Sequence, residues 1–276
     1  MTKIALTIAG VDPSGGAGTI ADVKTFAAFG VFPTAAIASL TFQNTQGVFG
    51  AEHQSAESVR QQIIPILDDY EVSAVKTGML PTREVIETVA AIIAERNLKN
   101  VVVDPVVRST SGFDLIDDVA LRSLIERLFP LADIVTPNIP EAERISGVAI
   151  DTENDIHDAA SVMQALGAKN VLIKGGHFGN TNVVMENAES RGTSGVRIAK
   201  DFLFLGSELK VFEGEYWDTT ATHGTGCTLS SAIAANLALG RDLTTSVEIA
   251  KRFVNEAIRT ASMIGRGHSP INIKAI

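Results

Sequence analysis

Residues 74–105 read AVKTGMLPTREVIETVAAIIAERNLKNVVVDP and contain two short apolar runs on either side of an amphipathic segment. Residues 74–77 and 101–103 are predicted strands, and Pro105 ends the second because proline cannot donate to a strand ladder. Residues 84–96 repeat their apolar side chains with the period of a helix. Strand, helix and strand in this order predict a β-α-β unit with parallel strands.

The same alternation continues along most of the chain and predicts a mostly parallel sheet covered by helices on both faces. Residues 180–215 are more polar, and their apolar runs at 183–185 and 202–205 predict antiparallel edge strands. No repeat or linker divides the sequence, so we expect a single domain over residues 1–276. The remaining predicted strands are 4–9, 35–40, 133–135 and 170–173, and the remaining predicted helices are 22–29, 58–69, 119–128, 155–166, 228–239 and 245–263.

Composition excludes several classes of protein. The chain has 276 residues, a net charge of -9 and no basic cluster, which argues against a nucleic-acid partner. No apolar stretch is long enough to span a bilayer, so no membrane association is expected. The single cysteine excludes an intrachain disulfide and fits the reducing cytoplasm.

Polar residues, glycines and prolines follow the predicted strands where each strand ends. In an open parallel sheet these carboxyl ends lie along one edge, and ligands bind in the crevice outside them. The sequence therefore predicts one shared crevice. The segments that should line it are residues 10–12, 41–44, 76–79, 104–105, 136–138 and 174–176.

Residues 222–228, Thr-His-Gly-Thr-Gly-Cys-Thr, hold the only cysteine and precede a predicted helix. Glycines at a helix start expose backbone N–H groups, so this turn suits phosphate or the charge of phosphoryl transfer. The same position lowers the pKa of a thiol and favours a thiolate at Cys227. The alternative is that Cys227 is a small buried filler.

Residues 12–18 form a glycine-rich loop that lacks the lysine and hydroxyl residue of a P-loop and the spacing of a dinucleotide loop. The loop either lets a ligand approach the backbone closely or is simply a tight turn. Asp22 either accepts hydrogen bonds from a ligand or complements a helix N-terminus. Lys76 is expected to be a solvated charge, and Met79 is either core or a contact for a planar ring.

Asp104 follows three valines, so its carboxylate is expected to project into the crevice. A divalent cation bound to substrate phosphates needs one or two carboxylates, and Asp104 and Glu141 could supply them. The alternative for Glu141 is a favourable acid in a helical turn started by Pro140. Lys174 would place a cation near polyphosphate, whereas His177 is interpreted as structural. The sequence patterns of α/β-hydrolases, zinc proteases and protein kinases are absent.

Together these segments resemble the ribokinase-like vitamin kinases, and specifically the hydroxymethylpyrimidine/phosphomethylpyrimidine kinases of thiamine biosynthesis. The resemblance implies a three-layer α/β/α sandwich, a homodimer, and Mg²⁺-dependent transfer from ATP to a pyrimidine hydroxymethyl group and then to its monophosphate. A monovalent cation is compatible with this family. The matching segments run in order across nearly the whole chain: 5–10, 12–18, 43–48, 75–80, 103–106, 136–143, 173–177 and 223–228.

The resemblance also implies roles for individual residues. Cys227 takes the position of the superfamily's catalytic base, behind which Gly224, Thr225 and Gly226 form the anion hole. The pyrimidine would lie against Gly10, Ala17, Met79 and Val106, with Asp22 and Gln43 hydrogen-bonding its ring nitrogen and amino group. ATP phosphates would be bound by Asn138, Lys174, Gly224 and Gly226, and the metal by Asp104 and Glu141.

Pyridoxal kinase is the main alternative within this family. One subgroup of those enzymes has a second cysteine in a lid, but here residues 107–112 contain none, and residues 43–45 match the pyrimidine kinases better. A sugar kinase is disfavoured because Cys227 stands where sugar kinases carry aspartate. A non-catalytic sensor is disfavoured because Asp104, Glu141 and Cys227 are all retained.

Overall fold

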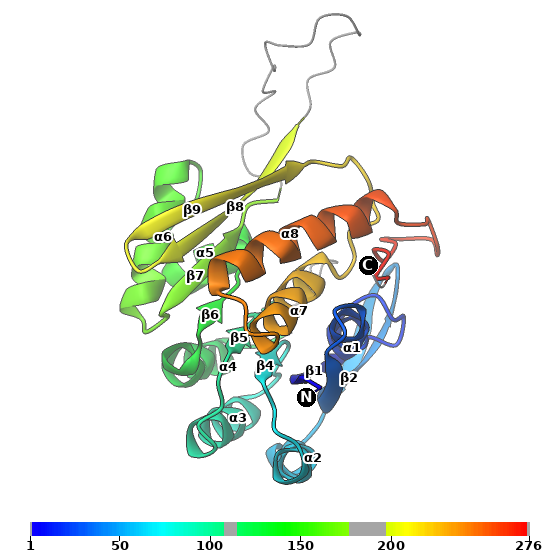
Figure 1. Cartoon of the computed structure of the whole chain (residues 1–276), viewed down its shortest axis with the longest axis vertical. Coiled ribbons are helices and arrows are strands. Elements are labelled where there is room, and N and C mark those ends of the chain that lie inside the picture. The colour runs from blue at the N-terminus through cyan, green and yellow to red at the C-terminus, as the bar shows by residue number, and fades with distance from the viewer. Residues whose placement is uncertain (1, 108–114, 177–196, 275–276) are drawn as a thin grey trace, which may run out of the picture.

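The computed structural model describes residues 2–107, 115–176 and 197–274, and its strands form one nine-stranded sheet (Figure 1). The order is β3-β2-β1-β4-β5-β6-β7-β8-β9. Pairing is parallel from β2 to β7, while β3, β8 and β9 are antiparallel, which confirms the predicted mostly parallel sheet with antiparallel edges. The strands are β1 (Ile4–Val11), β2 (Phe32–Asn44), β3 (Gly47–His53), β4 (Ala74–Thr77), β5 (Val101–Val103), β6 (Ile134–Val135), β7 (Asn170–Lys174), β8 (Ile198–Leu205) and β9 (Glu208–Glu215).

Helices cover both faces of the sheet, as expected for a three-layer sandwich. Successive side chains of a strand point to opposite faces. In β5, Val101 and Val103 therefore join one apolar cluster and Val102 joins the other. The first cluster lies under α2 (Ala56–Asp69), α3 (Arg83–Glu95), α4 (Asp118–Ser123), α5 (Ile139–Ser146) and α6 (Glu153–Ala165), and the second under α1 (Gly18–Ala28), α7 (Thr225–Ala238) and α8 (Leu243–Arg259).

Helix starts follow local capping chemistry. The Thr82 hydroxyl accepts a hydrogen bond from the Val85 N–H at the start of α3, and the Asp117 carboxylate accepts one from the Ala120 N–H at the start of α4. These side chains satisfy backbone donors that have no partner within the helix. The predicted helix 119–128 is divided, because α4 ends at Ser123 and a π-helical turn, Leu124–Leu128, follows it.

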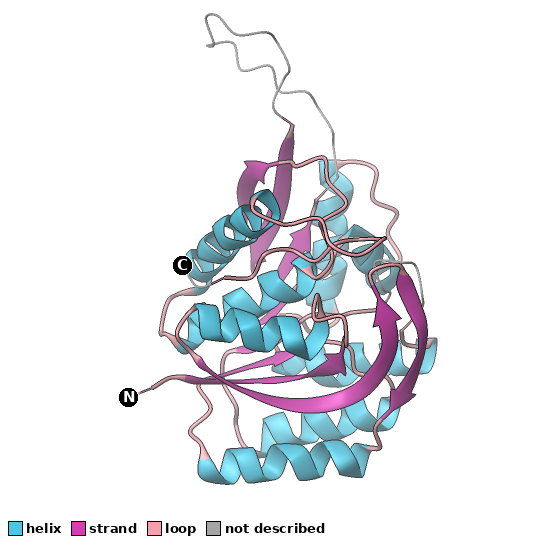
Figure 2. Cartoon of the chain, turned by 90° about the vertical axis from the view of Figure 1, so that its right-hand side faces the viewer, coloured by secondary structure: helices cyan, strands magenta, loops and turns pink. Residues whose placement is uncertain are grey.

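Strand β3 was not predicted, and β2 is longer than the predicted 35–40. The two strands form a curved antiparallel hairpin that faces the viewer in Figure 2. No residue of β3 is fully buried and two of its seven residues are glycine, so the sequence lacks the alternation that indicates a strand. Of the predicted edge segments, 202–205 lies within β8, and 183–185 lies outside the described residues.

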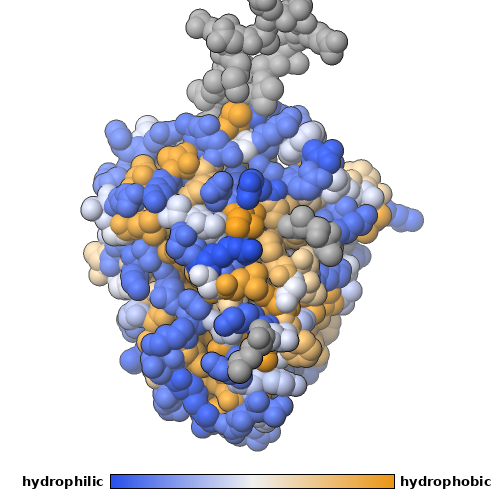
Figure 3. Space-filling model, in the orientation of Figure 1, coloured by the Kyte–Doolittle hydropathy of each residue, from blue (hydrophilic) through white to orange (hydrophobic). Residues whose placement is uncertain are grey.

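Hydrophilic residues cover most of the face shown in Figure 3, with smaller apolar groups between them. Among the described residues, none of the helices has the length and apolar character needed to cross a membrane. The large apolar side chains are instead concentrated in the two clusters on either side of the sheet.

Candidate active site

A cavity of about 760 Å³ opens at the carboxyl ends of the parallel strands. Its lining includes residues from every strand-end segment in which the sequence predicted a crevice, so that prediction is confirmed. The cavity also brings together all the predicted site residues except Asp22: Gly10, Ala17, Gln43, Met79, Asp104, Val106, Asn138, Glu141, Lys174, Gly224, Thr225, Gly226 and Cys227.

Helix α7 begins at the wall of this cavity. Gly224 precedes it with a φ of 85°, in the left-handed region that favours glycine, and no side chain caps the helix. A Cβ atom at Gly224 would collide with the carbonyl oxygen of Gly16, so glycine is also required by packing. The first-turn N–H groups of α7 have no partners within the helix, and they lie beside the cavity that Gly226 and Cys227 line. This arrangement can bind an anion.

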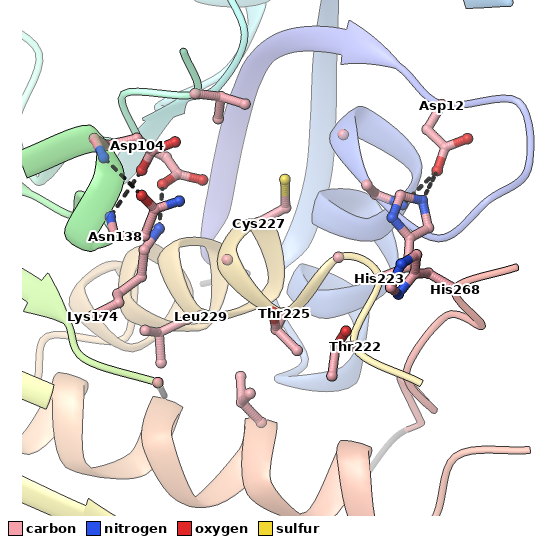
Figure 4. Close-up of a pocket in the computed structure, with 18 of the residues that line it drawn as sticks. Asp12, Asp104, Asn138, Lys174, Thr222, His223, Thr225, Cys227, Leu229 and His268 are labelled. Carbon is pink, nitrogen blue, oxygen red and sulfur yellow. Dashed lines mark hydrogen bonds and ion pairs between the residues drawn. The ribbon is translucent and has the colours of Figure 1, made fainter. Parts of the chain in front are cut away.

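Cys227 is half-buried and lies between two groups of polar side chains (Figure 4). Burial raises the pKa of its thiol to about 11, and the nearby Lys76 ammonium offsets only part of this effect. The expectation of a lowered pKa is therefore wrong for this structure, because desolvation and the carboxylates of Asp22 and Asp104 outweigh the Lys76 ammonium. The thiol is neutral at pH 7.

The first polar group centres on Asp104, which is 1% exposed. The Lys174 ammonium donates to Asp104 Oδ1 over 2.9 Å, and the Thr136 hydroxyl donates to the same atom over 3.1 Å. Burial opposes ionisation of Asp104, but Lys174, Lys76 and these hydrogen bonds outweigh it and hold its pKa below the usual value. Asp104 is thus a carboxylate aimed at the cavity, as predicted.

Glu141 combines the two interpretations that the sequence left open. Asn138 caps α5 by accepting a hydrogen bond from the Glu141 N–H, and the Glu141 Oε2 accepts one from the Asn138 N–H, each over 2.8 Å. Its carboxyl group also lines the cavity near Asp104 and Lys174. Burial raises the pKa of Glu141 to about 7; Lys174 opposes this shift, and Asp104 adds to it.

The carboxyl groups of Asp104 and Glu141 fit a hard divalent cation that is held mainly by phosphate oxygens. Such an ion needs only one or two protein carboxylates. No cluster of three or more His, Cys, Asp or Glu side chains that could hold a metal by itself occurs in the described part of the chain. The donor set therefore suits a metal that arrives with a phosphorylated ligand.

The second polar group lies on the other side of Cys227 and was only partly predicted (Figure 4). Its centre is a hydrogen bond of 2.7 Å between His223 Nε2 and Asp12 Oδ2. The amide of Gln43 lies next to this pair, with 3.3 Å between its nitrogen and His223 Nε2. Asp12 also accepts from the N–H groups of Gly16 and Ala17, which explains how the glycine-rich loop is held against the cavity.

Asp22 does not line the cavity and is fully buried. It accepts hydrogen bonds from Lys76, Thr7 and Ser231, so its oxygens are already engaged within the core. The expectation that Asp22 contacts a ligand is corrected accordingly. Lys76 is also fully buried, at 2.9 Å from Asp22, so the expected solvated charge is wrong as well.

Several lining residues gave no functional signal in the sequence. Lys251 donates to Asp201 Oδ2 over 2.7 Å, and Asp201 Oδ1 accepts from the Gly175 N–H over 3.1 Å. This buried pair anchors the backbone that follows Lys174, and it joins positions 50 residues apart. Trp217 also lines the cavity. His177 and residues 108–112, at the position of the lid in the pyridoxal kinases, lie outside the described residues.

Comparison with known proteins agrees with this geometry. A family model described as phosphomethylpyrimidine kinase matches residues 12–272. The hydroxymethylpyrimidine/phosphomethylpyrimidine kinase of Staphylococcus aureus is 41% identical over 271 residues, which cover 98% of this chain and 93% of that relative.

Solved structures extend the comparison to the whole fold. The phosphomethylpyrimidine kinase of Clostridium difficile has a TM-score of 0.77 and 40% identity, covering 93% of this chain and 100% of that structure. An ADP complex of Bacillus subtilis pyridoxal kinase has a TM-score of 0.86 and 35% identity, covering 100% and 98%. The resemblance read from the sequence is confirmed: the chain belongs to the phosphomethylpyrimidine kinase family.

Proposed function

We propose that this protein transfers the γ-phosphoryl group of ATP to 4-amino-5-hydroxymethyl-2-methylpyrimidine and then to the resulting monophosphate, as a step of thiamine biosynthesis. The observation that carries the proposal is one cavity with an uncapped helix N-terminus, an acid–lysine group and an amide side by side. The helix N-terminus suits the charge of the transferring phosphoryl group, and the acid–lysine group suits polyphosphate. The amide suits the polar edge of an aminopyrimidine. Family membership and the ADP complex of the B. subtilis relative support the use of ATP.

The proposed roles follow from position in the cavity. Phosphates are held by Lys174, Asn138 and the backbone N–H groups of Gly224 and Gly226. Thr225 completes the same turn. The pyrimidine lies against Gly10, Ala17, Met79 and Val106, and Gln43 recognises its polar edge.

Catalysis in this proposal depends mainly on placement and electrostatics. The N-terminus of α7 stabilises charge on the transferring group, and Lys174, next to Gly226, offsets charge on the phosphates. Cys227, in its thiolate form, accepts the proton of the attacking hydroxyl. Mg²⁺ held by Asp104 and Glu141 would neutralise phosphate charge, and a monovalent cation is compatible with the family.

The raised pKa of Cys227 has a consequence for this role. Because little thiolate exists at pH 7, turnover should rise with pH toward the thiol pKa of about 11. Replacing Cys227 with Ala should lower kcat by about 100-fold and leave the KM for ATP unchanged, as expected for a general base. If a folded Cys227→Ala protein shows undiminished turnover, Cys227 is not the general base, and the backbone anion hole alone supports catalysis at this turn.

We also propose that the protein acts as a single-domain homodimer in the cytoplasm. The dimer follows from the family resemblance and is supported by the exposed apolar side chains of β2 and β3. The cytoplasm is supported by the single cysteine, which cannot form an intrachain disulfide.

Pyridoxal phosphorylation is a second candidate, favoured by the structural likeness to the pyridoxal kinases of B. subtilis and S. aureus. The decisive assay measures ATP consumption with hydroxymethylpyrimidine, its monophosphate, pyridoxal and ribose side by side. We expect turnover with the first two compounds. Turnover with pyridoxal alone would overturn the proposal in favour of the second candidate.

A further inference from the structure

The side-chain amide of Gln43 lies between two anchors at the edge of the cavity. Its nitrogen is 3.3 Å from His223 Nε2, and its oxygen is 3.1 Å from the Thr41 hydroxyl. Turning the amide by half a turn exchanges nitrogen and oxygen without changing its shape, so hydrogen positions decide which atom faces which anchor.

The His223 anchor can only donate. Its Nε2 lies 2.7 Å from Asp12 Oδ2, and that oxygen also accepts two backbone N–H bonds. Burial opposes ionisation of Asp12, but its hydrogen bonds, foremost the one with His223, hold its pKa below the usual value, so the group is a carboxylate at neutral pH. A contact of this length with a carboxylate requires a hydrogen on Nε2. An amide nitrogen facing it would place two donors opposite each other.

The Thr41 anchor is an acceptor toward Gln43. The Thr41 hydroxyl has one hydrogen and two acceptors within reach, the Val11 carbonyl oxygen at 2.8 Å and the Gln43 side-chain oxygen at 3.1 Å. We assign the hydrogen to the shorter contact, with Val11. An amide oxygen at 3.1 Å would therefore face only the lone pairs of the hydroxyl. An amide N–H in the same place would make a hydrogen bond.

We propose that Thr41, His223 and Asp12 are specificity-determining positioning residues, which hold the Gln43 amide with its oxygen toward His223 and its nitrogen toward Thr41. In this orientation an amide N–H donates to the Thr41 oxygen, and the amide oxygen faces the His223 N–H, whose single hydrogen it shares with Asp12 Oδ2. The anchors therefore engage one of the two amide N–H groups and one side of the amide oxygen. One donor and one acceptor remain for a ligand, in fixed places.

This pattern deepens the proposed function and rests on it. An aminopyrimidine offers a ring nitrogen that accepts and a neighbouring amino group that donates, which matches the locked amide. An analogue with a ring N–H and a carbonyl at these positions presents the reverse pattern. The locked amide would face it with donor against donor and acceptor against acceptor, and unmade bonds between buried polar groups are costly.

The test compares kcat/KM for hydroxymethylpyrimidine with kcat/KM for the oxo analogue. We expect the unmodified enzyme to prefer the amino compound by at least about 100-fold. Thr41→Val removes one anchor and frees the amide to turn, so the preference should fall by about tenfold, the effect of one hydrogen bond. The KM for ATP should not change, and Thr41→Ser should restore the preference because it keeps the hydroxyl.

The matched control is Thr34→Val. Thr34 is a buried threonine of the same strand, and its hydroxyl donates to the Ala5 carbonyl oxygen away from the cavity. This variant should keep the full preference even if it loses a similar amount of stability. His223→Phe, which removes the other anchor, should lower the preference as Thr41→Val does.

The outcomes separate the inference from the function on which it rests. An unmodified enzyme that does not phosphorylate hydroxymethylpyrimidine refutes the proposed function. If the Thr41→Val and His223→Phe variants prefer the amino compound as strongly as the unmodified enzyme does, the proposed function stands. The inference that Thr41 and His223 position the Gln43 amide is then overturned. The ¹⁵N spectrum of the unmodified protein provides a direct readout: we expect His223 to carry a hydrogen on Nε2, and a ring protonated on Nδ1 alone would overturn the orientation.

Discussion

At the scale of single residues, burial and the nearest charges together decide the chemistry. Cys227 and Lys76 are both deprived of solvent, but only Lys76 has a partner of opposite charge that keeps it ionised. The Cys227 thiol loses solvation without an adjacent cation strong enough to compensate, so its pKa rises to about 11. Lys76 is fully buried, yet its ion pair with Asp22 raises its pKa and keeps it charged.

Alkylation of Cys227 tests this environment directly, because the chain has no other cysteine. The thiolate is the reactive form, so iodoacetamide should react more slowly at pH 7 than with a free thiol. Since the folded pKa is about 11, the rate should rise about tenfold per pH unit up to at least pH 9.5. Glutathione is the control and should level off above its own pKa. A plateau for the protein below pH 8 would contradict the raised pKa.

At the scale of secondary-structure elements, the start of α7 is held by two neighbouring serines. The Ser230 hydroxyl lies 2.9 Å from that of Thr136, which donates to Asp104. The Ser231 hydroxyl donates to Asp22 over 2.6 Å. Both serines lie one turn after Gly226 and Cys227, so the Lys174–Asp104 and Lys76–Asp22 pairs are both tied to the start of α7.

Thr136→Val should separate α7 from Asp104, the carboxylate that we propose binds the metal. We expect kcat to fall about tenfold, as for loss of a hydrogen bond to a charged group, and the Mg²⁺ concentration for half-maximal activity to rise. Thr136→Ser should restore both values.

Thr25→Val is the control for Thr136→Val. Thr25 is equally buried, but its hydroxyl donates to the Ala21 carbonyl oxygen within α1. If the Thr136→Val protein shows a lower melting temperature but an unchanged Mg²⁺ dependence, as expected for Thr25→Val, then Thr136 has only a structural role.

At the scale of the whole molecule, the β2–β3 hairpin at one side of the sheet exposes large apolar side chains. Leu40, Phe42 and Phe49 are 41%, 54% and 70% exposed along the β2–β3 hairpin. Exposed apolar side chains on an edge strand favour association. The proposed dimer would bury them.

Phe49→Glu should therefore convert the protein to a monomer, because it places a charge in the apolar contact. Light scattering after size-exclusion chromatography gives the mass in solution. Met263→Glu is the control, since Met263 is 65% exposed but lies outside this hairpin. A monomeric unmodified protein, or a Phe49→Glu protein that stays dimeric, would contradict an interface at this edge.

The sequence by itself determined the parallel sheet, its helices and the crevice at the strand ends, because these follow from local periodicity and from where polar residues interrupt apolar runs. The edge hairpin was missed because β3 is only half-buried and lacks that periodicity. The tertiary structure alone decided that Asp22 is bound by Lys76 inside the core, 54 residues away, instead of facing a ligand. It also brought Asp12 to His223 across 211 residues and His223 to Gln43 across 180. Such pairings, and the pKa of Cys227, depend on burial and on distances between atoms that no local pattern encodes.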